Sequence, residues 1–230
     1  MNAAVVTVGD ELLAGRTTNT NATWLCERLT DRDVTVERVT TVPDRIEDIS
    51  SVVGDYSAAY DAVLVTGGLG PTHDDLTMEA IAATFGRDLE TDETALEWLE
   101  EHGYSRSDLT TGTADLPAGS RPLHNEAGVA PGAVLENVYV LPGVPTEMRA
   151  MFETVAEEFT GTRVYRETVV ADEPESALLD RLENLNREFD VSVGSYPGES
   201  VRLELSGPDE ETVAAAATWL RERVETVEES

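Results

Sequence analysis

The stretch VLVTGGLGPTHDD, residues 63–75, takes the chain from an apolar run into a glycine-rich turn and then into two adjacent carboxylates. Residues 63–65 are an unbroken apolar run, which is typical of a parallel strand covered on both faces. The next segment, LTMEAIAATFG at 76–86, has the apolar spacing of one helix face, and Gly86 is placed to end that helix. The order strand, glycine turn, helix predicts one unit of an alternating α/β fold.

The same alternation continues on both sides of this unit. Strands and helices that follow one another in this way predict right-handed crossovers and a mainly parallel sheet with helices on both faces. We also expect a polar segment at 105–120. The expected strands are 3–8, 34–42, 62–66 and two short ones within 125–141, and the expected helices are 19–30, 44–60, 76–86, 93–102 and 146–159.

The pattern changes after residue 161. Residues 163–228 read as strand, helix, strand, strand, helix, which predicts a small α+β module at the end of the chain. We therefore expect two domains, 1–160 and 163–228. A module of about 70 residues is small enough that we expect it to depend on docking against the first domain.

The composition is strongly acidic. Among 230 residues there are 46 Asp and Glu against 16 basic residues, all of them Arg, so the formal net charge is −30. An acidic surface without Lys favours adaptation to a salt-rich, halophilic cytoplasm, where salt screens the self-repulsion of the chain; a surface selected for particular partners is the alternative. The charge argues against nucleic acid and anionic membranes as partners, because both need a basic patch.

The remaining composition predicts a cytoplasmic protein. No apolar run approaches the roughly 18 residues of a membrane span, and the N-terminus lacks the pattern of a signal peptide. The single cysteine, Cys26, cannot form an intramolecular disulfide and has no CxxC partner, so we interpret it as a core residue.

Three of the expected strands end in loops that contain glycine, near Gly9, Gly67 and Gly143. In an open parallel sheet, ligands bind beyond the carboxyl ends of the strands, so these loops are expected to line one site. Glycines let backbone amides approach an anion closely, and the amides of 67–72 are therefore candidates for a phosphate or pyrophosphate site. The alternative is a strand-to-helix turn that binds no ligand, because such a turn would also use glycine.

Two acidic pairs follow these strands. Asp74 and Asp75 beside a phosphate would repel it unless a cation lay between them, and Mg²⁺ binds through one or two carboxylates plus substrate phosphates. The alternative is that one of the pair caps the helix that begins near Leu76. Asp10 and Glu11 follow the first strand and are either part of the same site or merely solvated or capping residues.

Further polar residues lie near the expected site. Asn19 and Asn21 could contact a ligand's polar edge, or one could cap the helix 19–30. His73 is a weak hint of metal or acid–base function. Because GxSxG, HExxH and Walker A motifs are missing, metal-assisted attack on a phosphate ester or anhydride fits better than serine chemistry.

Three long motifs, in order, resemble the N-terminal domain of the competence/damage-inducible CinA family, which belongs to the molybdopterin-binding (MoaB/Mog) fold. They are VGDELLAGRTTNTNATWL from residue 8, DAVLVTGGLGPTHDDLTMEAIA from 61 and GVAPGAVLENVYVLPGVPTEMRAMFE from 128. Residues 163–228 resemble the family's KH-like module, but they lack a GxxG loop, so we expect a structural or dimer-building role and no RNA binding. The resemblance does not include the deamidase domain of longer members, so deamidase activity is not expected.

The resemblance implies a three-layer α/β/α domain, a homo-oligomer, and divalent-metal-dependent hydrolysis of pyrophosphates such as ADP-ribose, with FAD in some relatives. Mg²⁺ or Co²⁺ would be the cofactor, with K⁺ as an additional candidate and molybdopterin as the alternative ligand. Asp74, Asp75 and Glu11 match the positions of catalytic, metal-binding acids. The expected substrate-binding residues are Gly9, Asn19, Asn21, Thr66, Gly67, Gly68, Gly70, Pro71, Thr72, Pro142, Gly143 and Pro145.

Three functions follow in order of preference. The first is a metal-dependent nucleotide pyrophosphatase; the second is a protein that binds molybdopterin or a nucleotide without hydrolysing it; the third is a purely structural protein. The first two need the same phosphate site, so the sequence ranks them without separating them.

Overall fold

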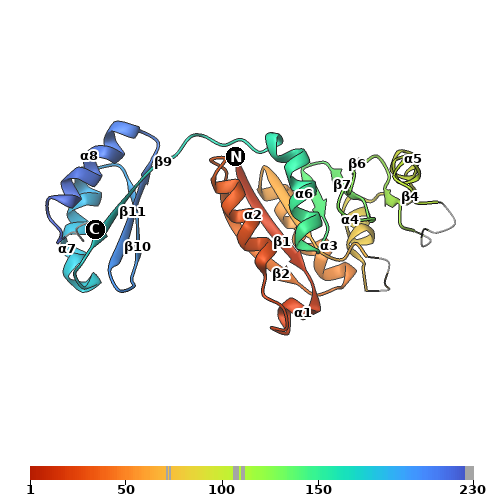
Figure 1. Cartoon of the computed structure of the whole chain (residues 1–230), viewed down its shortest axis with the longest axis horizontal. Helices are drawn as coiled ribbons and strands as arrows, with labels where there is room; N and C mark the ends of the chain where they lie inside the picture. Colours follow the sequence, from red (N-terminus) through yellow and green to blue (C-terminus); the bar gives the residue numbers. More distant parts are fainter. Residues whose placement is uncertain (71, 73, 106–108, 110–111, 226–230) are drawn as a thin grey trace. The chain divides into compact units, whose positions relative to one another are not determined.

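The computed structural model describes residues 1–70, 72, 74–105, 109 and 112–225 (Figure 1). The chain divides into two compact units, Met1–Gly161 and Thr162–Ser230. Each unit has its own sheet and its own hydrophobic core, so each is described by itself.

The first unit is built on a six-stranded sheet with the order β2-β1-β3-β8-β7-β6. The pairs β1 with β2, β1 with β3 and β3 with β8 are parallel, whereas β7 pairs antiparallel with both β8 and β6. The predicted mainly parallel sheet is therefore confirmed. The strands are β1 (Asn2–Val8), β2 (Thr35–Val42), β3 (Ala62–Thr66), β6 (Arg121–Leu123), β7 (Gly132–Leu135) and β8 (Val138–Leu141).

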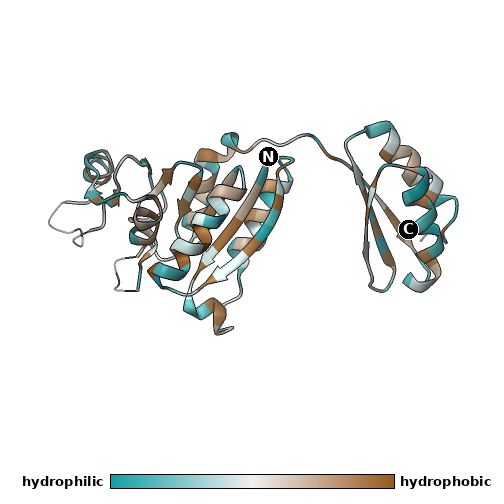
Figure 2. Ribbon diagram, turned by 180° about the vertical axis from the view of Figure 1, so that it is seen from behind, coloured by the Kyte–Doolittle hydropathy of each residue, from teal (hydrophilic) through white to brown (hydrophobic). Residues whose placement is uncertain are grey.

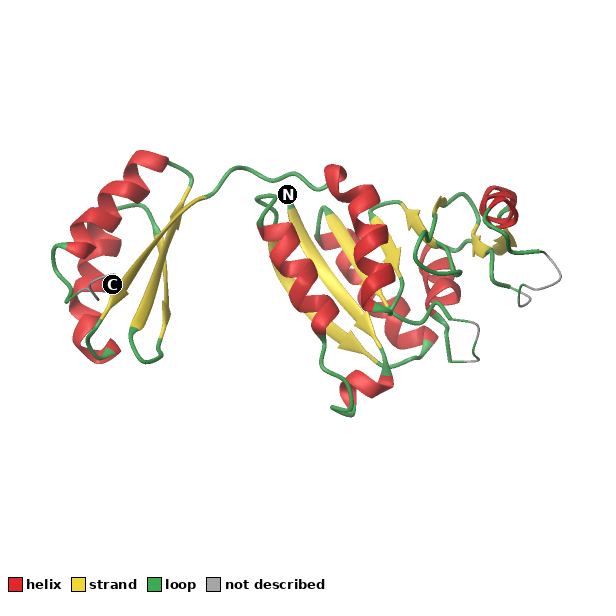
Figure 3. Cartoon of the chain, viewed as in Figure 1, coloured by secondary structure: helices red, strands yellow, loops and turns green. Residues whose placement is uncertain are grey.

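Helices cover both faces of this sheet, which gives the expected three layers (Figure 3). On one face, Val5 and Leu64 pack with α2 and α6; on the other, Val6 and Val65 pack with α3 and α4. Successive residues of β1 and β3 thus enter opposite cores, which is why residues 3–6 of β1 and 62–65 of β3 are all apolar (Figure 2). The helices are α1 (Asp10–Leu13), α2 (Thr20–Thr30), α3 (Ile46–Ala59), α4 (Thr77–Phe85), α5 (Glu93–Glu101), α6 (Pro145–Val155) and the 3₁₀ turn η1 (Ala156–Glu158).

Several short elements differ from the expectation. The segment 105–120, expected only to be polar, contains the unpredicted strand β5 (Asp115–Pro117), which pairs antiparallel with β4 (Leu89–Thr91). Helix α1 and strand β6 were also not expected from the sequence. These elements have only three or four residues, too few for a periodic pattern, and the three strands form because distant partners supply their hydrogen bonds.

The second unit is a three-stranded antiparallel sheet with the order β10-β11-β9 and two helices on one face (Figure 3). Its buried cluster joins Leu203 and Leu205 of the sheet to Leu178, Leu185 and Leu220 of the helices, and all of its members come from this unit. No helix in the described part of the chain is long and apolar enough to cross a membrane. The elements are β9 (Tyr165–Ala171), α7 (Glu175–Glu188), β10 (Ser192–Tyr196), β11 (Val201–Gly207) and α8 (Glu210–Arg221).

Candidate functional site

The loops after β1, β3 and β8 meet at one edge of the sheet, because these three strands are adjacent and parallel. They surround a cavity of about 240 Å³, which we call the strand-end cavity. The expected site residues that line it are Gly9, Glu11, Asn19, Asn21, Thr66, Gly67, Gly68, Asp74, Asp75, Gly143 and Pro145.

Three other expected residues are not in this lining. Gly70 and Thr72 line a neighbouring cavity, and Pro142 contributes its carbonyl, which accepts a hydrogen bond from Thr66 Oγ1 at 2.6 Å. Pro71 is outside the described residues, as is His73.

Glycines bring the main chains of these loops close together at two positions. Gly67 has φ +110°, and a Cβ built on it would lie 2.3 Å from the Val8 carbonyl oxygen. A Cβ on Gly143 would lie 3.2 Å from Gly67 Cα. The loop after β1 therefore contacts the loop after β3 through main chain at a point where a side chain would not fit, and the loop after β3 lies close to the loop after β8.

The two asparagines tie these loops together. Asn19 caps α2 by accepting from Ala22 N at 3.1 Å, and its Nδ2 donates to Thr7 Oγ1 at 2.9 Å, so the capping alternative applies to Asn19. Asn21 Nδ2 donates to Thr66 Oγ1 at 3.2 Å and to the Gly143 carbonyl at 2.8 Å. Asn21 Oδ1 is buried and has no hydrogen-bond partner among the described residues, so it remains an acceptor for a ligand.

Asp74 and Asp75, in the loop after β3, do not cap α4. The residue before the first turn of α4 is Leu76, which provides no side-chain cap, so the capping alternative for Asp74 and Asp75 is wrong. Instead the Asp75 carboxylate accepts from Thr72 N at 2.9 Å and from Thr72 Oγ1, and Asp74 Oδ1 also accepts from Thr72 Oγ1. Thr77 holds the start of the helix by donating from Oγ1 to the Gly67 carbonyl at 2.8 Å.

Asp44 is a site residue that we did not predict. It lines the strand-end cavity just after β2, and its Oδ2 accepts from Asp10 N at 2.7 Å. Burial raises the pKa of Asp44, and the charges of Asp10, Glu11 and Asp74 raise it further, although the hydrogen bond from Asp10 N opposes them. The rule that ligand sites follow strand ends would have found Asp44 had it been applied to the second strand.

Fewer backbone amides are free to bind an anion than we expected from the sequence. Gly67 N donates to the Leu141 carbonyl at 3.2 Å, and Thr72 N donates to Asp75, so both amides are already used. Within the described part of the chain, the amides of Gly68, Leu69 and Gly70 make no hydrogen bond. The expected anion site therefore narrows to residues 68–70.

The strand-end cavity has four carboxylates, Glu11, Asp44, Asp74 and Asp75, and its described lining contains no basic residue. A phosphate could enter it only with a cation. Among the described residues, however, no group of three His, Cys, Asp or Glu side chains is arranged to hold a metal ion by itself. The donor set fits a hard cation that shares its ligands between carboxylates, phosphate oxygens and water, as Mg²⁺ does, and does not fit a closed protein site.

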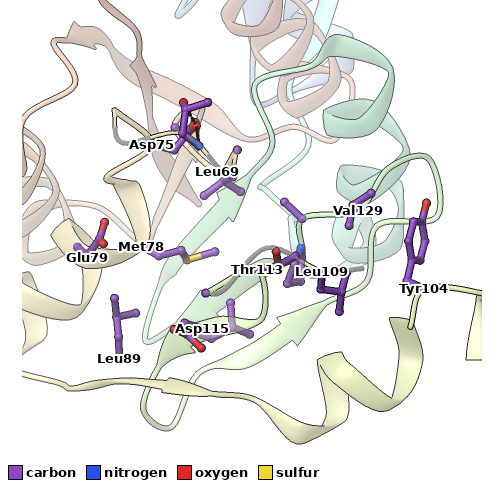
Figure 4. Close-up of a pocket in the computed structure, with 17 residues that line it drawn as sticks. Leu69, Asp75, Met78, Glu79, Leu89, Tyr104, Leu109, Thr113, Asp115 and Val129 are labelled. Carbon is purple, nitrogen blue, oxygen red and sulfur yellow. Dashed lines mark hydrogen bonds between the residues drawn. The ribbon is translucent and has the colours of Figure 1, made fainter. Parts of the chain in front are cut away.

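A second and larger cavity, which we call the lateral cavity, adjoins the same glycine loop. It has a volume of about 480 Å³ and shares Gly68 and Asp75 with the strand-end cavity. Figure 4 shows its lining, with Tyr104 and Val129 on the side away from Glu79. The glycine loop thus borders two cavities whose described linings both contain carboxylates, and the lateral cavity also has several aliphatic side chains and the aromatic ring of Tyr104.

Comparison with known proteins identifies the family. Residues 4–162 match the family model described as a probable molybdopterin binding domain, and residues 163–228 match that of the FAD synthase middle domain. A protein of Archaeoglobus fulgidus is 38% identical over 96% of this chain and 97% of its own, and one of Pyrococcus furiosus is 37% identical over 97% of each. The crystal structure of the protein CinA, of unknown function, from Thermoplasma acidophilum is 39% identical, covers 69% of this chain and 97% of its own, and superposes with a TM-score of 0.64. The chain therefore belongs to the family of the probable molybdopterin-binding domain, and its first unit is CinA-like.

Proposed function

We propose that this protein is a metal-dependent nucleotide pyrophosphatase that acts on ADP-ribose or a related dinucleotide such as FAD. The observation that carries this proposal is the strand-end cavity, whose described lining holds four carboxylates and no basic side chain and includes Gly68, the first of three residues, 68–70, whose amides make no hydrogen bond to another described residue. A site with this charge favours a cation together with an anionic ligand over either one alone.

The groups at this site would have different roles in the reaction. The amides of Gly68, Leu69 and Gly70 would bind diphosphate oxygens. Asp74, Asp75 and Glu11 would hold Mg²⁺ or Co²⁺, with K⁺ as an additional candidate. When bound, the divalent cation supplies neutralisation of the diphosphate charge and acidification of water.

The reaction would be hydrolysis of the P–O–P linkage. A water oxygen forms a new bond to one phosphorus while the bridging oxygen leaves with the other phosphate, and ADP-ribose yields AMP and ribose 5-phosphate. A carboxylate that lines the strand-end cavity would accept the proton that the water loses. The buried Asn21 Oδ1 can accept a hydrogen bond from the attacking water or from a ribose hydroxyl.

The first test is phosphorus NMR of the protein with ADP-ribose, with and without Mg²⁺ or Co²⁺. We expect Asp75→Asn to lower turnover by at least about a hundredfold, equivalent to about 2.7 kcal/mol of barrier, with the fold intact by circular dichroism. The exposed residue Asp55 on α3 provides the matched control, since Asp55→Asn removes one negative charge remote from the cavity. Full activity of Asp75→Asn would refute the assignment.

The family match supports a second candidate, a protein that binds molybdopterin without hydrolysing it. Tight pterin binding, together with an unchanged phosphorus spectrum for ADP-ribose and FAD, would favour this candidate. A purely structural protein would bind neither ligand, whereas a site filled at 100 times its Kd should add about 2.7 kcal/mol to the stability. The expected homo-oligomer stays a prediction, which light scattering of the purified protein would test.

A further inference from the structure

The lateral cavity adjoins the proposed phosphate site, because Gly68, Leu69, Gly70 and Asp75 are in its lining, and the rest of its lining has no part in the hydrolysis described above. It shares Gly68 and Asp75 with the strand-end cavity, so a ligand held at the amides of residues 68–70 would have both cavities within reach. It also has about twice the volume, 480 Å³ against 240 Å³.

The walls of the lateral cavity suit a flat ring. Leu69, Met78, Leu116 and Val129 give it apolar surface, and Tyr104 adds an aromatic side chain (Figure 4). A ring that enters the cavity removes apolar area from water, and both the aromatic ring and the methionine sulfur favour contact with a π-system. The described lining of the strand-end cavity contains no aromatic or methionine side chain.

The charged side chains in the described lining of the lateral cavity are carboxylates, which accept, whereas its threonine and tyrosine hydroxyls can also donate. Asp115 and Glu79 are carboxylates, and none of the described lining residues is basic. Asp115 Oδ1 accepts from Thr91 Oγ1 at 2.7 Å, which fixes the carboxylate, while its Oδ2 makes no hydrogen bond to another described residue. An ionised carboxylate can only accept, so it selects a ring that carries N–H donors over one that presents a carbonyl there.

We propose that the lateral cavity binds an amino-bearing heteroaromatic ring of the substrate, with Asp115 as the residue that recognises the exocyclic amino group and Tyr104 as the surface that the ring packs against. The inference rests on the proposed function and names its substrate class. Adenine and pterin share this chemistry. Each would lie in the lateral cavity while its phosphate reaches the amides of residues 68–70.

The test compares ADP-ribose with its hypoxanthine analogue, in which a carbonyl replaces the amino group. We expect the wild-type protein to favour ADP-ribose in kcat/KM by roughly tenfold to a hundredfold, because the analogue leaves Asp115 without its donor. Asp115→Asn keeps the shape and the acceptor for Thr91 but adds a donor, so the preference should fall to about threefold or less. Asp88→Asn, on an exposed residue just before β4, is the control that should keep the wild-type ratio.

The ring contact has its own variants. Tyr104→Ala should lower kcat/KM for both nucleotides by about tenfold, consistent with the value of one aromatic contact, and Tyr104→Phe should retain most of it. Turnover with a base preference that Asp115→Asn leaves unchanged overturns this inference and leaves the pyrophosphatase standing.

If no nucleotide is hydrolysed, calorimetric binding of ADP-ribose and of 6-hydroxymethylpterin phosphate decides the question. If Asp115→Asn weakens binding at least tenfold, the ring site is supported and only the hydrolase is refuted. The probe that binds then shows whether the ring is adenine or pterin. Binding that is unaffected by both Asp115→Asn and Tyr104→Ala overturns the ring site. Binding of neither probe overturns both proposals.

Discussion

Gly67 shows how one residue fixes the position of a loop. With φ +110° and the Val8 carbonyl oxygen 2.3 Å from the place of a Cβ, it combines a backbone conformation that favours glycine with a main-chain contact that excludes any side chain. Neither the Val8 carbonyl nor Gly67 can move without disturbing β1 or β3, which pair with each other.

We predict that Gly67→Ala destabilises the first unit by at least about 2 kcal/mol, because backbone strain and a steric clash add. Gly15→Ala is the matched control, since Gly15 also has a positive φ, +65°, but no atom lies within 4 Å of the place that its Cβ would take, so only about 1 kcal/mol of strain is expected. Urea denaturation followed by circular dichroism gives both values. Equal losses in the two variants would show that the contact with Val8 contributes nothing.

Asn19 and Asn21 have different roles that the sequence around them does not distinguish. The spacing allowed either residue to cap α2 or to contact a ligand, and the local sequence offered no way to choose. The structure uses Asn19 as the cap and leaves Asn21 Oδ1 buried without a partner in the described part of the chain. The choice depends on Thr66 and Gly143, which lie 45 and 122 residues away from Asn21 in the sequence.

At the scale of elements, a partly buried ion pair joins α7 of the second unit to the segment after α8. Arg181 Nη1 donates to Glu173 Oε1 at 2.6 Å and also to the Arg223 carbonyl, and Glu225 N donates to Glu173 Oε1 at 3.0 Å. The hydrogen bond from Arg181 is the largest cause that lowers the pKa of Glu173, and the bond from Glu225 N adds to it.

The sign of the pH dependence follows from this lowered pKa. The pair stabilises the second unit fully above the unfolded pKa of Glu, about 4.3, and the contribution is lost as the pH falls through the lower folded value. Glu173→Gln should therefore cost about 1 kcal/mol near pH 7 and progressively less below about pH 4. Thermal denaturation of the two proteins across this range measures the difference.

The control for this prediction is Glu183→Gln on the same helix. Glu183 and Arg187 form a surface pair with side chains 69% and 71% exposed, so its loss should cost no more than about 0.5 kcal/mol. If Glu173→Gln behaved like Glu183→Gln at every pH, the ion pair that holds the segment after α8 would have no energetic role.

At the scale of the whole molecule, the net charge of −30 dominates the behaviour of the chain in solution. The Debye length falls from about 10 Å at 0.1 M salt to about 3 Å at 1 M. The added salt therefore removes most of the repulsion between surface carboxylates. We predict that the melting temperature rises by several degrees when KCl is increased from 0.1 to 2 M. A parallel scan in sucrose, which favours burial without screening, separates the two effects. A melting temperature that sucrose raises and KCl does not would refute adaptation to salt.

The sequence by itself determined the alternation of strands and helices, the mainly parallel sheet and the loops that end in glycine. These features follow from local patterns of apolar residues and from the backbone freedom of glycine. Both depend only on residues that are close together in the sequence. It also pointed to the Asp74–Asp75 pair, because two carboxylates beside an expected phosphate site would repel the phosphate unless a cation lay between them.

Only the tertiary structure decided how these parts combine. The adjacency of β1, β3 and β8 brings three loops to one cavity, and strand order depends on packing between segments that lie far apart in the chain. The same packing forms β4 and β5, adds Asp44 to the site, uses the amide of Gly67 within the sheet and opens the lateral cavity beside Asp75. Each of these depends on long-range contacts, whose free energy belongs to pairs of residues and is therefore absent from any single stretch of sequence.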